Sequence, residues 1–129
     1  MSERERRGSD VEELTVAARF ESAGDVRKMS VGGAPGAPLV LREEIEGPSV
    51  RVAHGADRAR LDVRVPASCT GRLLAALGEL FGARSLAEFA RDEGNDILDL
   101  MDLCDREGIP YDFGFIDSNE DAALRRADL

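Results

Sequence analysis

The acidic segment near the C-terminus carries oxygen ligands at the spacing of a calcium-binding loop. The first, third, fifth and twelfth positions of that loop would be Asp117, Asn119, Asp121 and Asp128. Ala122 occupies the sixth position, where such a loop needs glycine, and Asp128 is shorter than the usual bidentate glutamate. Calcium is therefore a candidate cofactor, while a simpler interpretation is that Asp117 or Ser118 caps a closing helix.

Nucleophilic catalysis in this chain would depend on His54, the only histidine. The conceivable nucleophiles and orienting carboxylates are Ser49, Ser68, Cys69, Asp57 and Asp62. None of them stands in the G-x-S-x-G turn that exposes a catalytic serine, and His54 falls in an expected turn. The sequence therefore favours a non-catalytic protein.

A run of aspartates at spacings of three and four accompanies a predicted helix over 96–107. The apolar residues of this helix gather on one side, and the acidic residues lie on the opposite side, which should face water. With no histidine nearby, such carboxylates favour a solvated face or a docking surface for a basic protein over a metal site. The candidate partner-binding residues are Asp92, Asp96, Asp99, Asp102 and Arg106.

The first half of the chain shows the period-two alternation of half-buried strands. The strands expected are 14–20, 27–31, 39–45, 50–53 and 61–65. The last two would form an antiparallel hairpin through a turn at 54–57. Pro66 ends the pattern because a prolyl nitrogen cannot donate to a ladder. Residues 1–10 are charged and polar and are expected to form a disordered tail.

The second half of the chain changes to helical periodicity. Thr70 is placed to cap a helix that ends before Gly82, and Ser85 with Glu88 has the spacing of a capping box. The elements expected here are helices over 70–81, after Ser85, over 96–107 with Asn95 or Asp96 as its cap, and over 120–127, and a strand over 111–116.

Strands followed by helices predict an α+β fold, with a mostly antiparallel sheet in the N-terminal half packed by C-terminal helices. The chain has 129 residues, of which 43% are hydrophobic, a length that suits one core. We expect a single domain over 11–129, strand-rich over 11–66 and helix-rich and acidic over 67–129.

The charge is distributed unevenly. Residues 1–84 carry 13 acidic and 13 basic side chains, whereas residues 85–129 carry 13 acidic and 4 basic, so the net charge of −9 belongs to the second segment. Such a surface repels nucleic acid and anionic lipid, and neither is expected as a partner. It favours encounter with a basic protein, and it also keeps a small protein soluble. The lack of an apolar signal segment and the isolated Cys69 and Cys104 favour a cytoplasmic location.

These observations predict a non-catalytic protein–protein interaction module, such as a regulator, adaptor or inhibitor, that acts through an acidic helical surface. One alternative is a small-molecule or calcium-binding domain, including a small enzyme. Another is a structural homo-oligomer, a homodimer included, joined along an exposed sheet edge or an apolar helix face.

Overall fold

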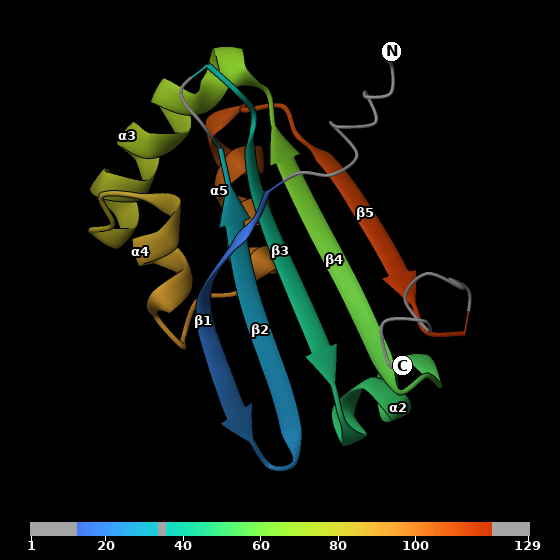
Figure 1. The fold of residues 1–129 in the computed structure, drawn as a ribbon. Coiled ribbons are helices and arrows are strands. Elements are labelled where there is room, and N and C mark those ends of the chain that lie inside the picture. Colours follow the sequence, from blue (N-terminus) through green and yellow to red (C-terminus); the bar gives the residue numbers. More distant parts are fainter. Residues whose placement is uncertain (1–12, 34–35, 120–129) are drawn as a thin grey trace.

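A computed structural model describes residues 13–33 and 36–119 (Figure 1). Within these residues five antiparallel strands form one sheet in the order β1-β2-β3-β4-β5. The strands are β1 (Thr15–Ser22), β2 (Asp25–Gly32), β3 (Leu39–Glu46), β4 (Arg58–Val65) and β5 (Asp112–Asp117). The helices are α2 (Pro48–His54), α3 (Thr70–Phe81), α4 (Leu86–Arg91) and α5 (Ile97–Glu107). The predicted α+β class, with its N-terminal antiparallel sheet and C-terminal helices, is confirmed.

Three helices cover one face of the sheet. Figure 1 shows α5 behind the strands, with α3 and α4 beside the β1 end of the sheet. In detail, α4 packs against β1 and β2, and α5 packs against β3 and β4. This arrangement leaves the opposite face of the sheet without a covering helix among the described residues.

The core lies between the sheet and the three helices. On the sheet side, Leu41 of β3 is directly opposite Val63 of β4, and both are fully buried. From the helices come Leu77 of α3, Phe89 of α4 and Leu100 of α5, which belong to the same buried cluster. Alternation along the strands and the 3.6-residue period of the helices bring these apolar side chains into one layer.

The hairpin predicted from 50–53 and 61–65 is wrong. Residues Pro48–His54 form the short helix α2, and β4 pairs instead with β3. Proline at the first helical position has a backbone angle suited to a helix, and Gly55 ends α2 in a left-handed conformation. The alternation of Val50 and Val52 was too short to distinguish a strand from a helix: Val50 is buried, and Val52 is 88% exposed.

The bounds predicted for the first long helix are confirmed, since α3 spans Thr70–Phe81, but the cap predicted at Thr70 is wrong. Gly82 adopts the left-handed conformation after α3, and its amide donates to the carbonyls of Gly78 and Leu77. Thr70 is not the cap, because a 3₁₀ turn over Ala67–Cys69 precedes α3. The Thr70 hydroxyl instead donates to the Ala67 carbonyl, at 3.2 Å.

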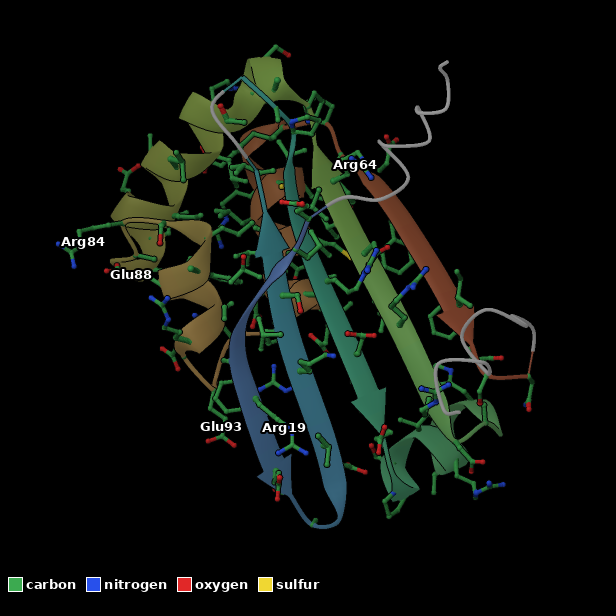
Figure 2. All side chains as sticks on the ribbon, in the orientation of Figure 1. Arg19, Arg64, Arg84, Glu88 and Glu93 are labelled. Atoms are coloured by element: carbon green, nitrogen blue, oxygen red, sulfur yellow. The ribbon has the colours of Figure 1, made fainter. Side chains whose placement is uncertain are left out.

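The capping box predicted at Ser85 and Glu88 forms in part. The Ser85 hydroxyl accepts from the Glu88 amide at 3.1 Å and so caps α4. The Glu88 carboxylate accepts from the backbone amide of Arg84 at 2.7 Å and from its guanidinium, not from the Ser85 amide. Figure 2 shows Arg84 and Glu88 together at the α3–α4 connection, pointing away from the sheet. These bonds lower the pKa of Glu88.

Replacing Ser85 by alanine is expected to reduce the free energy of unfolding by about 1 kcal/mol, because the Glu88 amide loses its acceptor. Urea denaturation of the purified chain measures this change. The matched control is Ser22→Ala, at an exposed position whose side chain forms no hydrogen bond within the described residues. Equal stability of the two variants would show that the Ser85 cap contributes nothing.

Two expected segments lie outside the described residues: the tail over 1–10 and the closing helix over 120–127. The expected strand over 111–116 is confirmed as β5, at the edge of the sheet beside β4. No helix in the described part of the chain is both long and apolar enough to cross a bilayer.

Candidate functional site

Three of the five predicted partner-binding residues line one groove. The groove lies between the end of α3 and the exposed side of α5, and its volume is about 290 Å³. The residues that line it are Leu80, Phe81, Asp99, Asp102, Leu103 and Arg106. We call it the α3–α5 groove. Asp92 and Asp96 lie outside it, at the end of α4 and the start of α5.

Three of the four predicted aspartates already bind local backbone. Asp92 accepts from the Gly94 amide at 2.9 Å. Asp96 accepts from the Asp99 amide at 3.0 Å, and Asp99 accepts in return from the Asp96 amide at 2.9 Å. This reciprocal pair is a capping box that begins α5. Asp96 and Asp99 therefore stabilise the helix whose acidic face they form.

Asp102 and Arg106 are the two charged side chains of the groove that have no bonding partner among the described residues. Both are exposed, and neither forms a hydrogen bond or ion pair within residues 13–33 and 36–119. They lie one helical turn apart on α5, so about 6 Å separates them along the helix axis. The groove therefore presents a negative and a positive group that remain free to interact with another molecule.

The floor of the groove is apolar, which the acidic pattern alone did not indicate. Leu80 is 42% exposed and Phe81 is 39% exposed, although both belong to a helix whose opposite side is buried. Phe81 is fixed by an edge-to-face contact with the buried Phe89, with 5.0 Å between ring centroids. The sequence did contain an indication of this apolar floor, because the segment that forms α3 has more apolar residues than one buried helix face needs.

The exposed face of the sheet differs from the helical side in its charge. Its basic and acidic side chains alternate across the strands: Lys28 lies 3.3 Å from Glu44, and Arg42 lies 2.8 Å from Asp62. Arg19 lies over the same face (Figure 2). Opposite charges on neighbouring strands compensate one another there. Residues 92–107, which form the α4–α5 connection and α5, carry seven acidic residues and one basic residue, so most of the acidic excess of the described residues lies there.

A buried ionic contact joins the sheet to the start of α5. Glu43 of β3 is only 5% exposed, and its Oε1 accepts from the Ile97 amide at 3.0 Å. The Arg27 guanidinium lies 4.0 Å from the same oxygen and donates to the carbonyls of Glu93 and Asn95. Together, Glu43 and Arg27 hold the α4–α5 connection against the sheet.

Desolvation raises the pKa of Glu43, with additional contributions from the negative charges of Asp96 and Asp99. The Ile97 amide and Arg27 oppose this rise. Glu43 was not among the predicted site residues. The sequence could have indicated its burial, because Glu43 lies between Leu41 and Ile45 at an inward position of the β3 alternation.

A cavity of about 430 Å³ lies beside Glu43. Two of the charged side chains around it are occupied within the protein: Asp25 accepts from the Ser49 amide at 3.0 Å, and Arg27 donates to backbone carbonyls. The Ser49 bonds lower the pKa of Asp25. These contacts favour a structural role for the cavity wall.

The candidate catalytic residues do not come together. His54 ends α2, and its ring packs against Phe115 with 5.0 Å between centroids. Asp57 pairs with Arg51, and Asp62 pairs with Arg42. Within the described residues no hydrogen bond joins His54 to a nucleophile or a carboxylate.

Both cysteines are buried and free. Burial raises the pKa of Cys104 to about 11, with smaller contributions from Asp105 and Cys69. The Cys104 thiol therefore stays protonated at neutral pH, which disfavours nucleophilic chemistry.

The candidate calcium ligands are described in part. Asp117 is buried at the end of β5 and accepts from the Asn119 amide at 2.9 Å, and the Asn119 side chain donates to the Gly55 carbonyl. Asp121 and Asp128 lie outside the described residues. Calcium binding thus stays a prediction. Among the residues that are described, no group of three acidic, histidine or cysteine side chains is arranged to hold a metal.

The acidic, apolar-floored groove is thus the described feature best suited to binding another molecule. Comparison of the chain with protein-family models, with curated proteins and with solved structures finds no match.

Proposed function

We propose that this protein is a non-catalytic protein-binding module that receives a basic partner on the α3–α5 groove. The observation that carries the proposal is that half-exposed Leu80 and Phe81 of α3 line the same groove as the charged side chains of α5. Solubility alone accounts for surface carboxylates, but it does not account for a leucine and a phenylalanine beside them. Protein interfaces combine an apolar centre with a polar rim in this manner.

The electrostatic surroundings favour a basic partner over an acidic one. From Glu79 to Glu107 the chain carries nine acidic and three basic residues. A cationic surface would be attracted during diffusion, so the main effect of this charge is a higher association rate that falls with salt. Apolar contacts in the groove would then provide most of the affinity.

The variant Asp102→Lys tests the proposal. Asp102 is the suitable position because its carboxylate caps no helix, whereas a change at Asp96 or Asp99 would also weaken α5. Affinity purification of the tagged chain at low and moderate salt, followed by mass spectrometry, is expected to recover a basic protein at low salt. Asp102→Lys should weaken its binding by about tenfold at low salt, because an attraction becomes a repulsion.

Asp112→Lys is the matched control, with the same change of charge on an exposed residue of β5. It lies opposite Arg64, on the face of the sheet away from the helices. Equal retention of the partner by both variants would exclude the α3–α5 groove as the binding site. Recovery of the chain alone at both salt concentrations would contradict the proposed function.

A further inference from the structure

Resting on the proposed function, we infer that the α3–α5 groove recognises a short peptide segment in which one bulky apolar residue lies between a basic and an acidic residue. The apolar residue would enter between Leu80, Phe81 and Leu103. The basic residue would face Asp99 and Asp102, and the acidic residue would face Arg106. The groove thereby selects the composition of the segment and determines which end of α5 its basic and acidic residues face.

The size of the groove limits the anchor to a single side chain. Its volume of about 290 Å³ lies at the lower end of the range for small-molecule pockets. A leucine, methionine or phenylalanine side chain suits a space of this size with an apolar floor. Such anchors in central pockets provide a large part of the affinity of many interfaces.

The order of charges along α5 gives the direction. Asp99, Asp102 and Arg106 follow one another along the helix, so the negative end and the positive end of the groove are about 10 Å apart. An extended peptide covers that distance in about three residues. A basic and an acidic residue about three positions apart, with the anchor between them, therefore match the groove.

The two charged side chains that have no bonding partner among the described residues support this assignment. Asp102 and Arg106 are one turn apart on the same helix, at a spacing suited to pairing, yet no ion pair joins them in the described structure. Each is therefore available to an opposite charge from a partner. A second basic residue at the Arg106 end would be repelled, so this end disfavours a uniformly basic segment.

Selection from a random twelve-residue peptide library displayed on phage, with the full chain as the target, tests the inference. The expected result is enrichment of peptides with one bulky apolar residue flanked by Lys or Arg on one side and by Asp or Glu on the other. Enriched peptides should bind Leu80→Glu at least about tenfold more weakly, because this change places a charge on the apolar floor.

Val52→Glu is the matched control, since Val52 is 88% exposed on α2 and lies outside the groove. Leu80 is preferable to Phe81 because Phe81 supports the buried Phe89. The double variant Asp102→Arg/Arg106→Asp keeps the net charge and exchanges the two unpaired charges of the groove, while Asp99 stays negative. Peptides enriched on the unmodified chain should bind this variant more weakly, because their charged flanks would then face like charges.

Peptides that bind Leu80→Glu and the unmodified chain equally would overturn the inference. So would equal binding of the enriched peptides to the double variant and the unmodified chain. After either of these results, the partner recovered by affinity purification could still bind Asp102→Lys more weakly than the unmodified chain. The proposed function would then stand, and only the inferred peptide recognition would fail. Loss of the dependence on Asp102 would contradict both.

Discussion

Replacing Phe89 by alanine is expected to lower the free energy of unfolding by about 3–5 kcal/mol. Phe89 is fully buried on α4, and its removal would leave a cavity in the core that α3, α4 and the sheet share. The edge-to-face contact with Phe81 would be lost as well. Domains of this size are stable by about 5–15 kcal/mol, so the change is a large part of the total.

Urea denaturation followed by circular dichroism measures the effect. Phe113→Ala is the control, because Phe113 is 46% exposed on the edge strand β5 and should cost less than about 1 kcal/mol. A loss below about 1 kcal/mol for Phe89→Ala would contradict the packing of α4 described above. Phe89→Ala should also affect the α3–α5 groove, because Phe81 would lose the contact that orients its ring.

Replacing Glu43 by alanine is expected to cost about 1–3 kcal/mol, because the buried Ile97 amide would lose its acceptor. The Arg27 guanidinium would also lose its nearest carboxylate. Glu43→Gln is the informative comparison, since an amide oxygen can still accept from the Ile97 amide. We expect Glu43→Gln to retain most of the stability that Glu43→Ala loses.

The free energy of unfolding of the unmodified chain and that of Glu43→Gln should depend differently on pH. Desolvation raises the pKa of Glu43 in the folded chain above its ordinary value of 4.5, so between these values the folded state binds more protons than the unfolded state. The contribution of Glu43 to stability is therefore fully present below pH 4.5 and is lost as the pH rises through the folded-state pKa. Glutamine does not titrate, so Glu43→Gln should lack this loss.

Urea denaturation of Glu43→Gln and the unmodified chain from pH 4 to pH 8 checks this difference. The other carboxylates, including Asp25 and Glu88 with their lowered pKa values, are present in both chains, so their contributions largely cancel. The stability of the variant relative to the unmodified chain should rise with pH and then become constant. A constant difference over the whole range would contradict the raised pKa of Glu43.

Local patterns in the sequence predicted much of the secondary structure. Alternation predicted β1, β2, β3 and β4, and apolar residues at helical spacing predicted α3 and α5. Gly82 marked the end of α3 correctly, and Asp96 is the cap of α5 from the predicted pair Asn95 or Asp96, because left-handed backbone and amide capping depend on residues within one turn. The helix α2 was missed, since a few alternating residues do not distinguish the two periods.

The sequence by itself determined the α+β class, the end of α3 at Gly82 and the acidic side of α5, because periodicity and capping depend only on neighbours along the chain. Tertiary structure alone decided that Glu43 accepts from the Ile97 amide and that Leu80 lies beside Asp102. Both contacts depend on how the helices cross the sheet and each other. The composition of the proposed binding site follows from that packing, which no local pattern specifies.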